Sequence, residues 1–253
     1  MIRRIRWQLM GAVSPRRILV RTPFGGSMIL SHSDGSGPQI FMGEYESDES
    51  RIIRETVTPG MVALDVGANI GYFTLLMAQN VGSTGKIHAF EPNPVMLHRL
   101  EQNIALNPGV RDGRISVHPY ALGSLDGEAE FFCPVEGFEG AGGLQNTNRA
   151  PVLSVKTVPV RTLDTAVREE RIGAIGFIKM DIEGGEFGVL KKGLHTLSQM
   201  QPTILFEAYE GNTAPYGYRV FEILAFLEAA GFCVRQAGMS YNFIAVPKAG
   251  KPA

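Results

Sequence analysis

Cysteine, unbalanced charge and long apolar runs are all scarce in this chain of 253 residues. The two cysteines, Cys133 and Cys233, give no metal-binding spacing and no disulfide framework. The formal net charge of −1 gives the whole molecule no bias toward nucleic acid. No stretch approaches the roughly 18 apolar residues of a transmembrane helix, and residues 7–15 are too weakly apolar for a signal peptide. We therefore expect a cytoplasmic protein without a transmembrane segment.

Charge is uneven at one end of the chain. Residues 1–21 contain six arginines and no acidic residue. We interpret this segment as a solvated lead-in that packs loosely on the domain; the alternative is a surface that meets an acidic substrate, a carrier or a membrane. The sequence is accordingly divided into an N-terminal basic segment with short strands, residues 1–43, and one α/β domain, residues 44–253.

Apolar runs typical of strands alternate with amphipathic stretches typical of helices from residue 61 onward. The expected strands are 61–66, 86–91, 114–118, 176–181 and 203–207. The expected helices are 70–80, 93–107, 162–170, 186–198 and 218–230. Residues 17–57 are expected to form short strands and turns. An antiparallel pair is expected at 128–133 and 153–160, around a glycine-rich loop at 134–151. A closing hairpin is expected at 232–236 and 241–246. This alternation predicts a mostly parallel sheet with helices on both faces.

Four of the expected strands end in a carboxylate. Their acids are Asp65, Glu91, Asp181 and Glu207, each directly after apolar residues. Acids favour the starts of loops and helices, which accounts for one or two of them. In a parallel sheet all four lie on one rim, where ligands of open α/β sheets bind. The pattern predicts a polar crevice suited to a cation or a polyhydroxyl group.

The first loop indicates which ligand this crevice takes. It reads Asp65-Val66-Gly67-Ala68-Asn69-Ile70-Gly71, so it lacks the G-x-G-x-x-G spacing of dinucleotide binding. Glu91 follows Gly67 by 24 residues and can accept hydrogen bonds from both hydroxyls of a ribose. S-adenosylmethionine has a ribose and no phosphates, so it fits this loop better than NAD.

These motifs resemble the FkbM family of class I S-adenosylmethionine-dependent methyltransferases. The similar segments are residues 65–71, Ala89-Phe90-Glu91-Pro92-Asn93-Pro94 and Lys179-Met180-Asp181-Ile182-Glu183-Gly184-Gly185-Glu186, within a span from about residue 44 to about residue 246. The sequence departs from the pattern at Gly185, where alanine is commoner. The resemblance implies a Rossmann-like α/β fold, with a mostly parallel seven-stranded sheet, helices on both faces and an antiparallel C-terminal edge hairpin. It implies methyl transfer to a hydroxyl oxygen of a sugar, another hydroxylated small molecule or a glycan.

The resemblance also implies roles for individual residues. The methionine part of the cofactor would lie near Asp65, Gly67 and Asn69, its ribose at Glu91, and its adenine near residues 120–122. The full set of expected cofactor-binding residues is Asp65, Gly67, Asn69, Tyr72, Glu91, Pro92, Ala121, Leu122 and Asp181. Asp181 would lie beside both the sulfonium and the acceptor.

An alcohol is a poor nucleophile, so a residue that takes its proton is expected at the site. Asp181 is the first candidate for this general base, and Glu183 and Glu207 follow it. The same three acids could hold Mg²⁺ or Ca²⁺; we favour the catalytic role and assign no metal site. Weaker candidates for acceptor contacts are Tyr45, Glu46, Lys179 and the 134–151 loop, and Lys179 reads first as an ionic partner of Asp181.

Two other functions remain open at this point. A nicotinamide-dependent oxidoreductase would share the fold and the ribose acid, although no Tyr-x-x-x-Lys arrangement is evident. A catalytically inactive cofactor-binding module would share the fold without the chemistry, and the acids at 65, 91 and 181 argue against it. Nucleic-acid methylation is disfavoured by the net charge.

Overall fold

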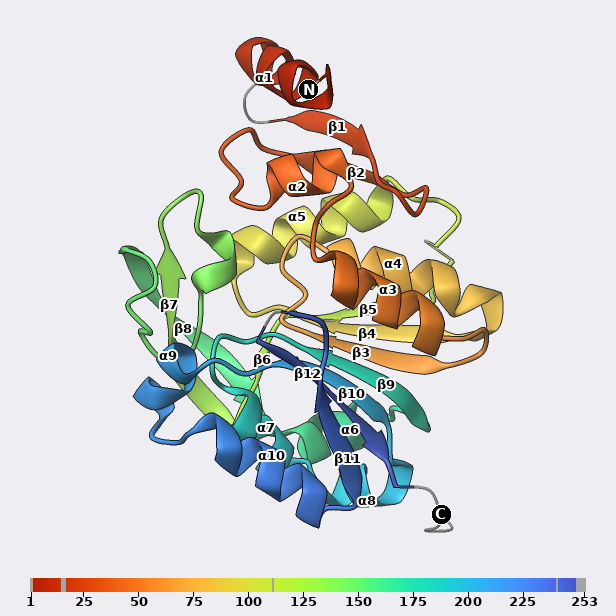
Figure 1. Ribbon diagram of the computed structural model, residues 1–253, viewed down its shortest axis with the longest axis vertical. Coiled ribbons are helices and arrows are strands. Elements are labelled where there is room, and N and C mark those ends of the chain that lie inside the picture. The colour runs from red at the N-terminus through yellow and green to blue at the C-terminus, as the bar shows by residue number, and fades with distance from the viewer. Residues whose placement is uncertain (1, 15–16, 111, 240, 249–253) are drawn as a thin grey trace.

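The computed structural model describes residues 2–14, 17–110, 112–239 and 241–248. Its centre is a seven-stranded sheet with the strand order β11-β12-β10-β9-β3-β4-β5 (Figure 1). The strands are β3 Val62–Val66, β4 Lys86–Phe90, β5 Ile115–His118, β9 Ile175–Met180, β10 Thr203–Glu207, β11 Phe232–Gln236 and β12 Asn242–Pro247. All neighbouring pairs are parallel except the two that involve β12, which lies one position in from the edge. The expected parallel sheet and its closing hairpin are confirmed.

Helices cover both faces of this sheet, with α3, α4 and α5 on one side and α6, α7, α8 and α10 on the other (Figure 1). Their bounds are α3 Ser47–Thr56, α4 Tyr72–Asn80, α5 Pro94–Ala105, α6 Leu163–Glu169, α7 Glu186–Lys192, α8 Leu194–Met200 and α10 Val220–Ala229. Successive residues of β3 face opposite layers: Ala63 packs in one hydrophobic cluster and Leu64 in the other. Because both faces are covered, most residues of the central strands are apolar.

The N-terminal segment differs from expectation. It forms α1 Ile2–Val13, a hairpin of β1 Ile18–Arg21 and β2 Ser27–Leu30, and α2 Gly37–Met42. The short strands expected within residues 17–57 are confirmed by β1 and β2, but α2 and α3 are helices where strands and turns were expected. The expectation that this segment packs loosely on the domain is also wrong for α1, because the side chain of Trp7 is buried.

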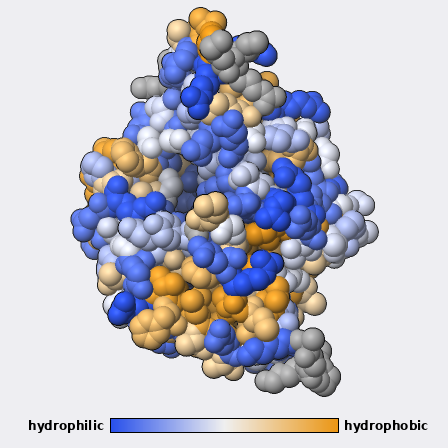
Figure 2. Space-filling view, in the orientation of Figure 1, coloured by the Kyte–Doolittle hydropathy of each residue, from blue (hydrophilic) through white to orange (hydrophobic). Residues whose placement is uncertain are grey.

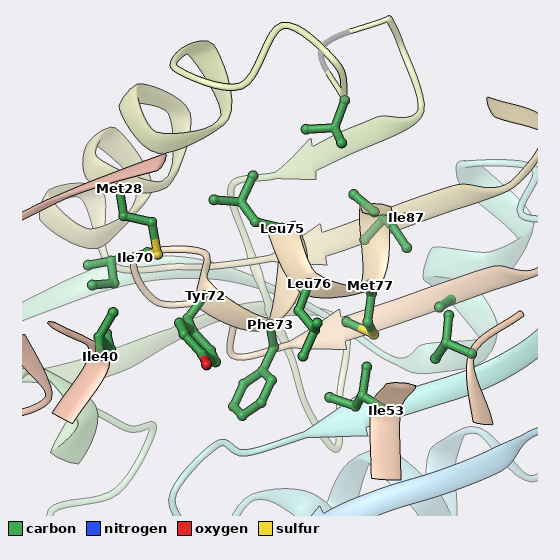
Figure 3. Close-up of a cluster of buried hydrophobic side chains, with 14 of the residues drawn as sticks. Met28, Ile40, Ile53, Ile70, Tyr72, Phe73, Leu75, Leu76, Met77 and Ile87 are labelled. Atoms are coloured by element: carbon green, nitrogen blue, oxygen red, sulfur yellow. The ribbon is translucent and has the colours of Figure 1, made fainter. Parts of the chain in front are cut away.

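A single core extends across the boundary expected between residues 43 and 44. Met28 and Ile40 pack in the same hydrophobic cluster as α4, whose Leu75, Leu76 and Met77 are fully enclosed (Figure 3). An apolar helix that is buried on all sides needs cover on the side away from the sheet. The N-terminal segment and α3 supply that cover. Within the described residues, none of the helices combines the length and the apolar character that a membrane crossing requires.

The expected antiparallel pair forms a second, smaller sheet with the strand order β6-β8-β7. Its strands are β6 Ala121–Leu122, β7 Gly127–Pro134 and β8 Val152–Arg161. The glycine-rich loop between β7 and β8 contains a 3-10 turn at Glu139–Ala141 and pairs back through a bridge between Phe132 and Gly143. The loop therefore has a defined path beside the carboxyl ends of the central strands.

One expected helix is divided in two. The stretch 186–198 forms α7 and α8, which meet at Gly193. A Cβ at Gly193 would lie 2.4 Å from Cδ2 of Leu163 in α6, so the break lets α6 pack closely. Between β10 and α10 the chain forms α9 Glu210–Thr213 and a 3-10 turn at Ala214–Tyr216.

Candidate active site

Four acids from four adjacent strands gather at the carboxyl edge of the sheet, as the sequence predicts. The strands β10, β9, β3 and β4 are consecutive neighbours and run parallel. Glu207 is the last residue of β10, Asp181 follows β9, Asp65 lies one residue before the end of β3, and Glu91 follows β4. Two cavities that share Gly67, Asn69, Glu139, Gly140 and Asp181 open along this edge.

The first of these, here called the cofactor cavity, lies over β3 and β4. Its apolar lining comes from Phe90, Met96, Ala121, Leu122, Phe131, Leu144 and Ile182. Its polar lining includes Glu91, Asn69 and Asn93. A narrow apolar slot with a few convergent polar groups is typical of a small-molecule cofactor site.

Glu91 is the best-positioned polar group in the cofactor cavity. Its Oε2 accepts a hydrogen bond from the backbone N–H of Asn69, and its Oε1 accepts one from the N–H of Asn93, each at 2.8 Å. Two fixed donors leave the remaining lone pairs of this carboxyl group for ligand hydroxyls. The Oδ1 atom of Asn69 is buried without a partner among the described residues. An orphaned acceptor beside a buried carboxyl group fits the hydroxyl and amino groups of S-adenosylmethionine.

The second, here called the acceptor cavity, has a volume of about 330 Å³. It lies between α2, the glycine-rich loop and the ends of β9 and β10. Five carboxyl side chains and two cations line it: Glu46, Glu139, Asp181, Glu183, Glu207, Arg149 and Lys179. Tyr45, Tyr72 and Phe73 supply aromatic surface, and the Tyr45 and Tyr72 rings meet edge to face at 5.0 Å.

Two ion pairs hold the acids of the acceptor cavity. Nζ of Lys179 lies 3.2 Å from Oδ2 of Asp181, so the ionic partner expected for Lys179 is present. NH1 of Arg149 lies 2.5 Å from Oε2 of Glu183 and 3.9 Å from Oε2 of Glu207. One carboxylate oxygen from each of Asp181, Glu183 and Glu207 lies within 4.8 Å of the others, a separation that a cation can bridge. In this structure the guanidinium of Arg149 contacts two of the three.

Crowding of carboxyl groups shifts their protonation. Burial, followed by the charge of Asp181, raises the pKa of Glu46 and that of Glu207, each to about 7. Burial and then Asp181 and Glu207 raise the pKa of Glu183 against the opposing effect of Arg149. Burial lowers the pKa of Lys179, but Asp181 and other carboxylates outweigh it, and the net shift is upward. Lys179 is therefore a cation, and Glu46 and Glu207 change charge near neutral pH.

Backbone strain is concentrated at the same place. Three non-glycine residues that line the acceptor cavity have left-handed backbone conformations: Glu46 at φ 39°, Asn69 at φ 49° and Glu183 at φ 58°. Such conformations cost about 1–3 kcal/mol each and tend to occur at functional sites. The surrounding fold holds these three side chains in positions that a relaxed loop would not give.

The residues expected from sequence divide between the two cavities. Gly67, Asn69 and Asp181 line both, while Glu91, Pro92, Ala121 and Leu122 line the cofactor cavity. Tyr45, Glu46, Tyr72, Lys179, Glu183 and Glu207 line the acceptor cavity. Tyr72, expected at the cofactor, thus lies on the acceptor side. The side chain of Asp65 lines neither cavity and accepts a hydrogen bond from Oγ1 of Thr74 at 2.5 Å.

Sequence reasoning missed several contributors. Arg149 gave no signal because it follows polar and glycine residues in a loop with no periodic pattern. Asn212, on α9, donates to Oε2 of Glu183 at 2.7 Å and lies in a segment between two expected elements. Only the length of the glycine-rich loop indicated that it could contact ligands.

Residues 65–234 match the family profile described as the methyltransferase FkbM domain. The chain belongs to the FkbM methyltransferase family. Membership of a methyltransferase family argues against the nicotinamide interpretation.

Three known proteins are similar to this FkbM methyltransferase. The hexuronic acid methyltransferase AglP of Haloferax volcanii is 28% identical over 169 residues, which cover 66% of this chain and 63% of that protein. The structure of methyltransferase FkbM from Methylobacillus flagellatus has 18% identity and a TM-score of 0.50, covering 84% of this chain and 55% of that one. The S-adenosylmethionine-dependent O-methyltransferase of Thermotoga maritima has 14% identity and a TM-score of 0.52, covering 94% and 80%. The two structures show the shared fold alone.

Proposed function

We propose that this enzyme transfers the methyl group of S-adenosylmethionine to a hydroxyl oxygen of a sugar or another polyhydroxylated acceptor. The observation that carries the proposal is the position of Asp181. It lines both cavities, so one carboxyl group faces the cofactor side and the acceptor side at once. The acceptor cavity around it is rich in carboxyl oxygens, which accept hydrogen bonds from hydroxyl groups.

The chain's own residues divide the work as follows. S-adenosylmethionine supplies an activated methyl group when it is bound. Glu91 and Asn69 would hold the ribose and the amino-acid part in the cofactor cavity. Lys179 holds Oδ2 of Asp181 and leaves Oδ1 to take the proton of the acceptor hydroxyl. Positioning two reactants in line lowers a barrier by several kcal/mol, and general-base help is worth about 10²–10⁴ in rate.

The charge of the acceptor cavity favours a neutral sugar. Above about pH 7, where Glu46 and Glu207 are ionised, carboxylates outnumber the two cations of this cavity, so a free carboxylate on the acceptor would meet repulsion. The relative AglP is named for hexuronic acid, which carries such a carboxylate. We therefore expect methyl incorporation into neutral glycosides to exceed incorporation into the matching uronic acid glycosides.

The test measures methyl transfer and cofactor affinity separately. On an acceptor found by screening neutral glycosides with radiolabelled cofactor, Asp181→Asn should lower turnover by about 10²-fold. Its affinity for S-adenosylhomocysteine, measured by calorimetry, should stay near that of the parent. Glu91→Ala is the matched comparison and should mainly weaken the cofactor. Unchanged turnover in Asp181→Asn would remove the base assignment, and methylation confined to nitrogen acceptors would remove the proposal.

A further inference from the structure

Helix α1 carries an apolar stripe that nothing in the described part of the chain covers. The helix lies at one end of the molecule, above the β1–β2 hairpin (Figure 1). Trp7 anchors it: its side chain is buried and its ring lies 5.4 Å from that of Phe41. On the opposite side, Ile5, Leu9 and Val13 are 54%, 63% and 87% exposed. Their spacing of four residues places them on one face of the helix.

The stripe continues onto the neighbouring strand. Leu19 on β1 is 59% exposed, and a shallow groove that contains Leu9, Val13 and Leu19 joins the helix to the strand. Figure 2 shows hydrophobic residues at this tip of the molecule beside hydrophilic ones. Single exposed apolar side chains are common on protein surfaces, whereas a contiguous group of four is typical of a surface that binds a partner or a membrane.

The described charges on α1 and β1 are all positive, while one exposed acid, Glu44, lies with Arg4 in the groove on the α2 side. Arg4, Arg6, Arg17 and Arg21 are exposed, and the first acidic residue of the chain is Asp34. An amphipathic helix with an outward apolar stripe and arginines beside it has the composition that inserts at the headgroup level of anionic membranes. A second copy of the same surface would bring arginines against arginines, so the charge disfavours self-association.

We propose that α1 and β1 dock this protein on an anionic membrane surface, with Ile5, Leu9, Val13 and Leu19 entering the interface and the arginines contacting lipid phosphates. The position of the acceptor cavity follows from this docking. A groove between α1 and α2 is lined by Arg4, Gly35 and Gln39, and the last two also line the acceptor cavity. Given the proposed function, the acceptor is then a sugar carried by a membrane lipid, which enters the cavity from the α1 side.

Vesicle co-sedimentation tests the docking. The full chain should pellet with vesicles of phosphatidylcholine and phosphatidylglycerol at low salt, and binding should fall as salt screens the arginines. Phosphatidylcholine vesicles should bind it at least about tenfold more weakly. The variant Ile5→Gln/Leu9→Gln/Val13→Gln should lose about tenfold or more in affinity for the anionic vesicles. Its affinity for S-adenosylhomocysteine should stay unchanged, which shows that it folds.

The matched control changes exposed apolar residues elsewhere. Phe221 on α10, Leu125 and Leu153 are 59%, 54% and 70% exposed. Their joint replacement by Gln should leave vesicle binding as it is. A second readout uses a Cys233→Ser background with an environment-sensitive fluorophore on Leu9→Cys or on Phe221→Cys. Anionic vesicles should blue-shift the first fluorophore and leave the second as it was.

Three results would overturn the docking. In the first, the parent protein does not bind anionic vesicles. In the second, the stripe variant binds them as well as the parent does. In the third, sedimentation shows that the parent is a dimer and the stripe variant a monomer, and neither protein binds vesicles. The vesicle measurements need neither cofactor nor acceptor. A failure of the proposed methyl transfer therefore leaves them intact, and a failure to bind vesicles leaves the assignment of Asp181 intact.

Discussion

Gly67 and Asp181 pack so closely that a Cβ on Gly67 would lie 2.0 Å from the carbonyl oxygen of Asp181. This contact joins the loop after β3 to the end of β9, and so joins the cofactor cavity to the proposed base. Gly67 also has a left-handed backbone, with φ at 84°. The backbone at Asp181 therefore leaves room only for a glycine at position 67.

A substitution at Gly67 tests this contact. Gly67→Ala should lower the free energy of unfolding by about 3 kcal/mol or more, because conformational strain adds to a clash with rigid backbone. Gly25 is the control: its φ is 89° and nothing lies within 4 Å of its Cβ position. Gly25→Ala should cost only about 1 kcal/mol for the strain. Urea unfolding measures both, and equal losses would contradict the close contact.

Cofactor affinity should depend on pH through Glu91. Burial raises the pKa of Glu91 to about 7, so its carboxylate form is lost as the pH falls through that value. The protonated form offers fewer acceptors to ribose hydroxyls. Affinity for S-adenosylhomocysteine should therefore fall about tenfold per pH unit below about pH 7 and level off above it. Calorimetry of Glu91→Gln should give weaker binding with a flat profile; a slope that persists in this variant would point to another group.

The ion pair of Arg149 and Glu183 should matter for the stability of the loop. Arg149→Gln leaves the carboxyl groups of Glu183 and Glu207 without their guanidinium and should cost about 1–2 kcal/mol of unfolding free energy. The carboxyl groups of Glu183 and Glu207 have raised pKa values, so they ionise and repel as the pH rises. The loss should accordingly be larger at alkaline than at acid pH.

A double-mutant cycle provides the control for this pair. Glu183→Gln placed in the Arg149→Gln background should recover part of the lost stability, because it removes one of the repelling carboxylates. Urea unfolding at several pH values gives the coupling. Additive effects at every pH would show that the two side chains do not interact in solution.

Two stacked histidines should make the fold sensitive to acid. Nδ1 of His88 lies 2.9 Å from Nε2 of His118, and both side chains are buried. Burial, with the charges of His118 and Lys86, lowers the pKa of His88 from 6.5 to about 4. The unfolded chain protonates His88 at a higher pH than the folded protein does. The contribution of neutral His88 to the free energy of unfolding is therefore complete above about pH 6.5 and is lost as the pH falls toward about 4.

The loss should amount to about 1–3 kcal/mol over that interval. Urea unfolding of His88→Gln across the same range should show a shallower acid slope than the parent. A slope identical in the two proteins would assign the acid sensitivity to other groups.

The central sheet was readable from sequence because its strands are buried on both faces. Continuous apolar runs such as Ile204–Phe206 before Glu207 leave little ambiguity, and an acid at the end of each run gives the position of the rim. The helices α2 and α3 were missed because they are short or highly charged and bury few residues, among them Ile40, Ile52 and Ile53. Amphipathic periodicity is weak over so few buried positions.

The site was only partly readable for a related reason. Residues next to strand ends, such as Glu91 and Asp181, are placed by the register of the sheet, which sequence patterns indicate. Arg149 and Asn212 reach Glu183 from a loop and a short helix whose paths depend on tertiary packing. Tyr72 lines the acceptor cavity, and the direction of its side chain depends on where α4 begins.

The burial of Trp7 determines how firmly α1 belongs to the rest of the molecule. A helix joined by a flexible linker would tether the catalytic domain at a variable height and in any orientation. Because Trp7 packs in the same hydrophobic cluster as α4, the helix is instead fixed rigidly to the catalytic domain. An enzyme held in this way keeps one orientation and would search for its acceptor in two dimensions, with the entrance to its cavity at a constant distance from the lipid plane.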